Sequence, residues 1–253
     1  MDIYQSVHHT DFIDYNVGGH HVMAPDFLVR HHPRADWERE RFASMARYLS
    51  PGMVLFDVGA EQGYMSAIYS RFVGGGENMV LFEPVPQVWP NIRHTWLRNS
   101  ITPPRATYCG LVSDHDHVSE YHDFVTGYRD VWPECAYGDM LLDATKFRYE
   151  TEHAHCTDTI RLDTFVESTG IKPDAITVDV EGFEPLVMEG AKHVLTRYRP
   201  LVWLSLHEAN NIMNRSMGGD SMLRAQEFMT SMGYRSEWLA TDHEQHWRYW
   251  YEL

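Results

Sequence analysis

The sequence predicts an α/β fold with a mostly parallel sheet, and three observations support this prediction. First, short apolar runs alternate with segments of helical spacing along most of the chain, as in strands joined by crossover helices. Second, one apolar run leads through a glycine-bearing turn directly into a helix, which is how a ligand site begins in such folds. Third, the last two apolar-aromatic runs, residues 234–239 and 246–252, are joined by a short turn, which adds an antiparallel pair and makes the sheet mixed.

The glycine turn follows the first predicted strand. Residues 53–56 are apolar, Asp57 ends the run, and the turn contains Gly59, Ala60 and Gly63. Glycine permits both a sharp turn and the close approach of a ligand to the backbone. The helix that follows has unpaired N–H groups in its first turn, and these point at whatever lies above the glycine turn.

The chemistry of this turn favours a cationic ligand. The dinucleotide fingerprint G-x-G-x-x-G is absent, and the pattern is D-x-G-x-x-x-G with Glu61 inside the turn. A second acid would repel a pyrophosphate but suits the amino and sulfonium groups of S-adenosylmethionine (SAM). A plain strand–turn–helix without a ligand has the same pattern. We expect the SAM-binding residues of the turn to be Asp57, Gly59, Ala60, Glu61 and Gly63.

The next two predicted strands are also followed by acids. An apolar run over residues 78–82 ends at Glu83, some 20 residues past the turn. An acid at this place binds the ribose hydroxyls in α/β sites, because a carboxylate can accept from both the 2′-OH and the 3′-OH. A helix is expected over 88–97 and a third strand over 106–112. Asp114 follows that strand, and we expect it to accept a hydrogen bond from the adenine amine.

Two further strands carry the candidate catalytic residues. The strand over 175–178 ends at Asp179, with Glu181 two residues on, and the strand over 199–206 ends at His207. Acids crowded at one strand end repel each other unless they serve a ligand. That ligand could be an acceptor hydroxyl, the SAM amino group, or a divalent cation such as Mg²⁺ held by Asp179 and Glu181. A neutral His207 could take the proton from a hydroxyl. Helices are expected over 185–198 and 221–232.

The other segments lie outside this alternation. Residues 1–35 carry three pairs of histidines at irregular spacing, which argues against a metal site. We interpret them as an N-terminal extension or cap with a hairpin turning at Gly18-Gly19. The main domain, 36–253, is expected to open with a helix over 36–49 that Asp36 caps. Residues 117–153 are irregular and rich in aromatic side chains, which either contact a substrate or anchor a loop; we interpret them as a substrate-side insertion.

The composition restricts the possible partners. The chain has 253 residues, a net charge of −15 and three cysteines without a C-x-x-C pair. The negative charge disfavours a nucleic acid as the main partner, and the cysteine usage favours a reducing compartment, the cytoplasm. No apolar run approaches the ~20 residues of a membrane span, and no signal peptide is expected. We therefore expect a small-molecule or glycan partner and no membrane, while the oligomeric state stays open.

The motifs together resemble the FkbM-type family of SAM-dependent methyltransferases, from about Trp37 to Leu206. The resemblance implies the class I methyltransferase fold, which is Rossmann-like with seven strands, and O-methylation of a hydroxyl on a sugar, glycan or natural product. It also implies that Asp57, Gly59 and Gly63 line the methionine end, that Glu83 holds the ribose, and that Asp179 and Glu181 face the acceptor. The matching segments are 56–64, 82–84, 162–165, 178–184 and Gly190-Ala191.

Three positions depart from that family's pattern. Glu61 stands where asparagine is usual, Thr177 where lysine is common, and Ser205 where glutamate is common. Charged groups are therefore expected to be missing beside the strand ends. Two other functional classes stay open: a non-catalytic SAM- or nucleotide-binding module, and a metal-dependent hydrolase that uses Asp179, Glu181 and His207.

Overall fold

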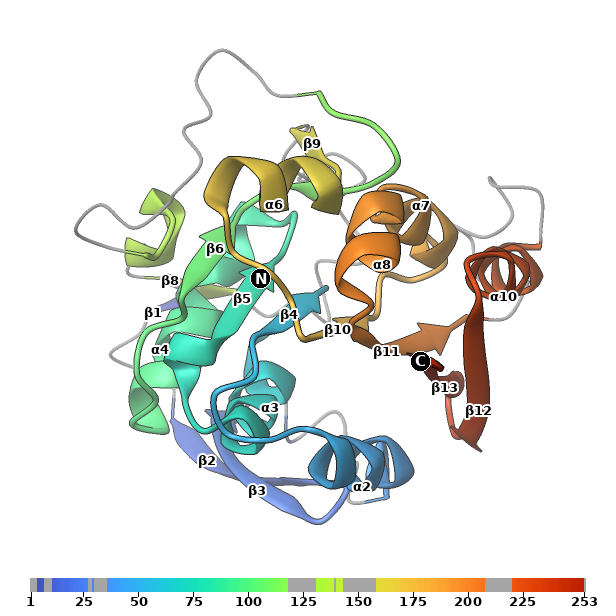
Figure 1. Ribbon diagram of the computed structural model, residues 1–253. Coiled ribbons are helices and arrows are strands. Elements are labelled where there is room, and N and C mark those ends of the chain that lie inside the picture. The colour runs from blue at the N-terminus through green and yellow to red at the C-terminus, as the bar shows by residue number, and fades with distance from the viewer. Residues whose placement is uncertain are drawn as a thin grey trace.

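A seven-stranded mixed sheet forms the centre of the molecule in the computed structural model (Figure 1). The structure describes residues 4–6, 11–26, 29, 36–117, 131–138, 140–142, 158–207 and 220–252. Most of the expected aromatic insertion, and residues 30–35 before the expected boundary at 35/36, lie outside these ranges. The strand order is β12-β13-β11-β10-β4-β5-β6. The strands are β4 (Leu55–Val58), β5 (Met79–Phe82), β6 (Ala106–Tyr108), β10 (Ala175–Val178), β11 (Leu201–Leu206), β12 (Tyr234–Thr241) and β13 (Gln245–Tyr251).

The direction of the strands brings the expected site residues to one edge of the sheet. Strands β6, β5, β4, β10 and β11 are parallel, and β13 runs antiparallel to both β11 and β12. The carboxyl ends of β4, β5, β10 and β11 therefore meet at the same edge. The chain order reverses between β4 and β10, and ligands in open α/β sheets bind at such a switch point. The predicted α/β mixed sheet is confirmed.

Helices cover both faces of the sheet, each over its own apolar core (Figure 1). The core on one face contains buried residues of α2 (Arg39–Tyr48), α3 (Tyr64–Val73) and α4 (Trp89–Arg98). The core on the other face contains those of α6 (Leu162–Thr169), α7 (Glu184–Glu189), α8 (Lys192–Tyr198) and α10 (Ser221–Ser231). Because both faces are covered, the central strands are buried along their length, which explains their continuous apolar runs. No helix in the described part of the chain is long and apolar enough to cross a membrane.

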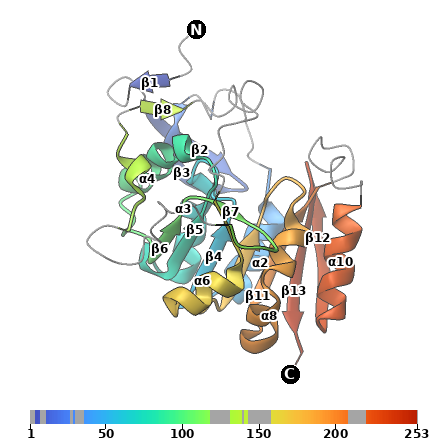
Figure 2. The same ribbon diagram turned by 90° about the horizontal axis from the view of Figure 1, so that it is seen from above.

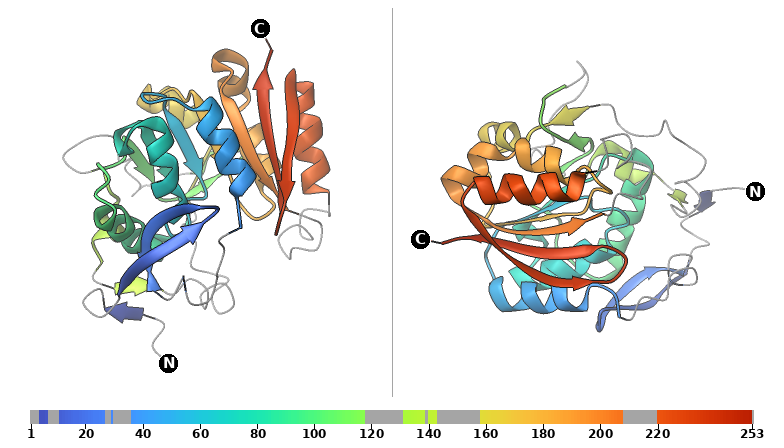
Figure 3. Two further views of the ribbon diagram at one scale, coloured as in Figure 1. Left: turned by 90° about the horizontal axis from the view of Figure 1, so that it is seen from below. Right: turned by 90° about the vertical axis from the view of Figure 1, so that its right-hand side faces the viewer.

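The predicted N-terminal hairpin is present and packs on the helical layer. Strands β2 (Phe12–Val17) and β3 (His20–Pro25) pair antiparallel and lie against α3 and α4, as Figures 2 and 3 show. Four of its apolar side chains are buried in the core on that face: Tyr15, Val17, Val22 and Ala24. The hairpin thus contributes to the hydrophobic core on that face. Two small sheets pair β1 (Tyr4–Ser6) with β8 (Met140–Leu142) and β7 (Leu111–Val112) with β9 (Thr159–Ile160).

Two predicted elements are each divided in the structure. The expected strand over 106–112 is divided, because Leu111 and Val112 leave the main sheet and pair with β9. The expected helix over 185–198 is two helices, α7 and α8. It breaks at Gly190, where a Cβ would lie 1.9 Å from the Ser113 carbonyl oxygen. Asp163 then caps α8, since its carboxylate accepts from the N–H groups of residues 193 and 194 at 3.0 and 2.9 Å.

The first helix of the main domain also begins later than predicted. The N-cap of α2 is Glu38 rather than Asp36, and Glu38 has a left-handed backbone with φ +59°. The N–H of Glu38 donates to the Asp242 carboxylate at 3.0 Å, a residue in the β12–β13 turn. A hydrogen bond to a residue 204 positions further along the chain therefore holds the backbone at the start of α2.

Candidate active site

The glycine turn after β4 is held tightly by the protein itself. Gly59 and Gly63 have φ of +96° and +76°, a region that favours glycine. A Cβ on Gly59 would lie 1.9 Å from the Asp179 carbonyl oxygen, and one on Gly63 would lie 2.9 Å from Cα of Ile92. The N–H groups of Gly59 and Ala60 both donate to the Phe82 carbonyl at 3.0 Å. Close packing against β10 and α4 therefore requires these glycines, independently of any ligand.

Glu83 is anchored beside this turn. Its side chain is buried, with the residue 6% exposed. Oε2 accepts from the N–H of Glu61 at 2.9 Å, and Oε1 accepts from the N–H of Val85 at 2.9 Å. Burial raises the pKa of Glu83 to about 8, against the opposing effect of these two hydrogen bonds. Each oxygen has a further lone pair for a ligand hydroxyl, so the carboxylate is oriented without being saturated.

Asp57 and Asp114 lie in different surroundings from Glu83. Asp57 is the third residue of β4 and is buried, and its Oδ2 accepts from the Ser66 hydroxyl of α3 at 2.5 Å. Burial raises the pKa of Asp57 to about 6. Asp114 lies after β7 with a side chain 41% exposed and contacts its neighbours Ser113 and His115. The hydrogen bonds with these neighbours lower the pKa of Asp114.

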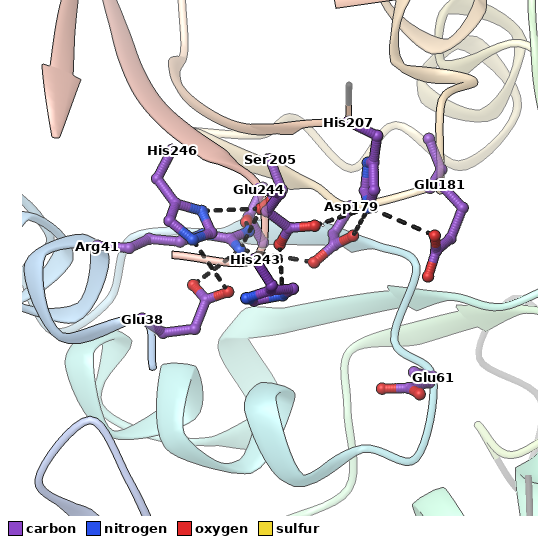
Figure 4. A network of polar contacts seen from close by, with 12 residues as sticks. Glu38, Arg41, Glu61, Asp179, Glu181, Ser205, His207, His243, Glu244 and His246 are labelled. Atoms are coloured by element: carbon purple, nitrogen blue, oxygen red, sulfur yellow. Dashed lines mark hydrogen bonds and ion pairs between the residues drawn. The ribbon is translucent and has the colours of Figure 1, made fainter. Parts of the chain in front are cut away.

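The predicted catalytic residues converge at the ends of β10 and β11 (Figure 4). His207 follows β11 and its Nε2 faces Glu181 Oε2 at 3.5 Å and Asp179 Oδ1 at 3.7 Å. Two more carboxylates surround the same ring. Glu244 Oε2, from the β12–β13 turn, lies 2.7 Å from Nε2, and Glu184 Oε1, the first residue of α7, lies 3.0 Å from Nδ1. We name these five residues the His207 cluster.

The electrostatics of the His207 cluster give its members different protonation states. His207 is desolvated, but the hydrogen bonds to Glu184 and Glu244 more than offset this and raise its pKa to about 11. It is therefore an imidazolium at neutral pH in this arrangement and donates through both nitrogens. Burial, with repulsion from Glu244, raises the pKa of Asp179 to about 7, and the attraction of His207 and Arg41 opposes that rise. The Asp179 carboxyl, which titrates near neutral pH, thus lies beside the His207 cation.

A buried arginine that sequence reasoning missed supports this cluster from α2. Arg41 donates to Glu38 Oε2 at 3.0 Å, to Ser205 Oγ at 2.6 Å, and to the Thr177 hydroxyl. Its Nη1 is 3.8 Å from Asp179 Oδ2. The expectation that charged groups are missing beside the strand ends is wrong, because Arg41 fills the space above the small hydroxyls of Thr177 and Ser205. The neighbouring acids hold the pKa of Arg41 above its usual value despite burial.

The β12–β13 turn supplies the second missed set of residues. His246 Nε2 lies 2.8 Å from Asp242 Oδ1 and 3.6 Å from Glu38 Oε1, and its Nδ1 lies 3.2 Å from Ser205 Oγ. His243 stacks on Trp37 with ring centroids 3.7 Å apart and approaches Glu244 Oε1 at 3.1 Å. The alternation of acids and histidines over 242–246 was the available signal, and the sequence interpretation treated it only as a turn.

The structure thus gathers the expected residues into two neighbouring groups. One is the glycine turn with Glu61 and Glu83, and the other is the His207 cluster. They meet where Gly59 packs against the backbone of Asp179. Figure 4 places Glu61 apart from the His207 cluster, at the turn. An oriented carboxylate for hydroxyls at one end and a polar acid–imidazolium cluster at the other can hold a nucleoside with a cationic tail next to a second, hydroxyl-bearing molecule.

Comparison with known proteins agrees with this geometry. The family sequence model described as "Methyltransferase FkbM domain" matches residues 57–236, more than two thirds of the chain. A search of curated proteins gave no match. Among solved structures, methyltransferase FkbM from Methylobacillus flagellatus is similar with a TM-score of 0.50 and 13% identity, over 85% of this chain and 59% of that one. This chain therefore spans less than two thirds of that relative.

Two further structures are similar at lower scores. Precorrin-6y C5,15-methyltransferase from Geobacter metallireducens has a TM-score of 0.45 and 14% identity, over 85% of this chain and 88% of that one. Fibrillarin from Aeropyrum pernix, solved with bound SAM, has a TM-score of 0.46 and 11% identity, over 99% and 100%. The fold assignment rests on the FkbM structure and on the strand order, which together confirm the class I methyltransferase fold. By the family model, the chain belongs to the FkbM methyltransferase family.

Proposed function

We propose that this protein is a SAM-dependent O-methyltransferase that methylates a hydroxyl of a sugar, glycan or natural-product-like small molecule. The family supports the transfer of a methyl group. The observation that carries the cofactor assignment is the pair of backbone hydrogen bonds that orients the Glu83 carboxylate beside the glycine turn. A carboxylate held in this way presents its remaining lone pairs to two adjacent hydroxyls, as a ribose requires.

The charge of the surroundings supports SAM over a dinucleotide. Asp57 and Glu61 lie on or beside the glycine turn, and Arg41, a cation that acts on Asp57, is buried and already donates to Glu38. A pyrophosphate would be repelled there, whereas the amino group and sulfonium of SAM would be attracted. Bound SAM would supply a methyl group on a sulfonium, which is an excellent leaving group. Accordingly the protein has to position the acceptor and accept one proton. Placement of the two reactants alone can lower the activation free energy by ~7–11 kcal/mol.

We place the acceptor hydroxyl at the His207 cluster. Asp179 and Glu181 are its two open members, with side chains 34% and 37% exposed, so they can contact a substrate. As the acceptor oxygen forms its bond to the methyl carbon, the carbon–sulfur bond breaks and the hydroxyl proton has to leave. His207 already carries a proton in this arrangement, so the carboxylates of Asp179 and Glu181 are the proton acceptors, and His207 is the cation that orients them. General base catalysis of this kind contributes roughly 10²–10⁴-fold.

Calorimetric titration with SAM tests the cofactor assignment. Glu83→Ala removes two hydrogen bonds to ribose and should weaken SAM binding roughly 10- to 100-fold. The matched control is Glu77→Ala, an exposed glutamate just before the other end of β5, which should leave the affinity unchanged. Equal SAM affinity in the wild type and Glu83→Ala, or a preference for NAD, would refute the assignment. Release of S-adenosylhomocysteine with a panel of hydroxyl acceptors then tests the transfer itself.

A further inference from the structure

The His207 cluster has the arrangement of a metal site. Three elements contribute to it: the end of β10, the end of β11, and the β12–β13 turn. Asp179, His207 and Glu244 each offer one ligand atom, and these atoms lie within 4.8 Å of one another. We propose that these three residues bind one first-row divalent transition metal ion, such as Mn²⁺ or Zn²⁺, at the acceptor end of the site.

The spacing of the atoms agrees with this proposal. Ligand atoms about 2.1 Å from a common metal ion lie roughly 3.0–3.4 Å apart for angles between octahedral and tetrahedral. His207 Nε2 lies 2.7 Å from Glu244 Oε2 and 3.7 Å from Asp179 Oδ1, so these distances bracket that range. The two carboxylate oxygens lie within 4.8 Å of each other, so all three atoms face a common point. The ion would replace the proton that Nε2 otherwise carries.

The surroundings of His207 orient it as a ligand. Its Nδ1–H donates to Glu184 Oε1 at 3.0 Å, which leaves Nε2 facing the carboxylates. Glu184 is fully buried and is itself held by the N–H of Gly182 at 3.1 Å. A buried carboxylate behind the far nitrogen of a histidine is the usual partner of a metal-binding imidazole. The other oxygen of this side chain, Oε2, is buried and has no hydrogen-bond donor among the described residues.

The charge balance of the connected network favours a divalent cation. Its described carboxylates are Glu38, Asp179, Glu181, Glu184, Asp242 and Glu244, and its described basic groups are Arg41, His207, His243 and His246. With all six acids ionised and every histidine protonated, six carboxylates against four cations leave a charge of −2. Half of these groups are buried, where excess charge is costly. A divalent ion that takes the place of the His207 proton would reduce this excess from −2 to −1.

The ligand types select the class of metal. Imidazole suits Zn²⁺, Fe²⁺ and similar ions, whereas Mg²⁺ prefers oxygen ligands and keeps most of its water. One imidazole with two carboxylates therefore fits a first-row ion better than Mg²⁺. Asp179 is partly exposed and Glu244 is 1% exposed, so the ion would be closed on the protein side and open toward the acceptor. On the proposed methyl transfer, such an ion would lower the pKa of the acceptor hydroxyl, and Glu181 would accept its proton.

Calorimetric titration of the metal-stripped full chain with Mn²⁺ and with Zn²⁺, without SAM, tests the site. We expect one equivalent of either ion to bind. Asp179→Asn should weaken binding at least tenfold, and Glu184→Gln, which acts through His207, should weaken it 10- to 100-fold. The matched control is Glu189→Gln on α7, whose side chain pairs with Arg224 outside the cluster and should have no effect.

Three results would overturn the proposal: no uptake by the wild type, equal uptake by the wild type and Asp179→Asn, or binding of Mg²⁺ as tight as that of Mn²⁺. Thermal melts show whether each variant folds, and Asp179 is exposed enough for Asp179→Asn to do so. SAM binding is measured in a separate titration. Metal uptake without SAM uptake would refute the proposed function and leave the metal site standing.

Discussion

Replacing Arg41 with methionine should destabilise the whole domain. Arg41 lies on α2 with a side chain only 2% exposed, and its partner Glu38 is 4% exposed. The variant removes the guanidinium from the buried Glu38 carboxylate, which keeps only the His246 imidazole at 3.6 Å among the described residues, and removes the donors to the hydroxyls of Thr177 and Ser205. Methionine fills much of the same volume, so the effect comes from lost charge and hydrogen bonds rather than from a cavity.

The size of the loss follows from the burial of this pair. Removing one partner of a buried ion pair costs about 3–5 kcal/mol, because the other charge loses its hydrogen-bonded partner in a poorly solvated place. For a protein of this length each kcal/mol lowers the melting temperature by about 2–4 °C, so the variant should melt roughly 10 °C below the wild type. Differential scanning calorimetry, with urea unfolding as a second measurement, gives both quantities.

Two comparisons isolate the cause. Arg47→Met removes an exposed arginine from the last turn of the same helix and should change the free energy of unfolding by less than about 0.5 kcal/mol. Adding Glu38→Gln to Arg41→Met removes the orphaned charge and should recover part of the loss. A loss below 1 kcal/mol in Arg41→Met, or no recovery in the double variant, would refute the reasoning.

Two further predictions concern the glycine turn. Gly59→Ala should lower the free energy of unfolding by on the order of 3 kcal/mol or more, because its Cβ would overlap the Asp179 carbonyl oxygen. Gly52→Ala has nearly the same φ, +94°, with nothing within 4 Å, so it measures the backbone strain alone, and urea unfolding that found equal losses would exclude the steric cause. For Glu83, the folded pKa of about 8 lies above its ordinary 4.5, so its contribution to stability is present at low pH and is lost as the pH rises through 8. At about 1.4 kcal/mol per pH unit the full loss is on the order of 5 kcal/mol. The melting temperature measured from pH 5 to 8.5 should therefore fall less steeply with pH in Glu83→Gln than in the wild type. Parallel slopes for the two proteins would contradict this.

Local pattern determined the elements that carry the site. The apolar run that becomes β10, residues 175–178, and the strand ends at Glu83 and His207 lie where the sequence predicts them. The glycine turn and the terminal strand pair are also predicted correctly. These features depend on neighbours along the chain: a buried strand needs a continuous apolar run, and a sharp turn needs residues with left-handed backbone. The same patterns, with the family motifs, were enough to predict the fold class.

Tertiary structure alone decided what surrounds the predicted residues. Arg41 looks like an ordinary polar position of an amphipathic helix, and only the packing of α2 against β10 and β11 buries it beside Asp179. Glu244 looks like a turn residue until antiparallel pairing of β13 with β11 brings it to His207. The Arg41–Ser205 and His207–Glu244 contacts join residues 164 and 37 positions apart and leave no periodic pattern in the sequence. They arise from the order of strands in the sheet and not from the local conformation of either segment. The protonation of His207 follows from those contacts, so the sequence could name the histidine but not the charge it carries.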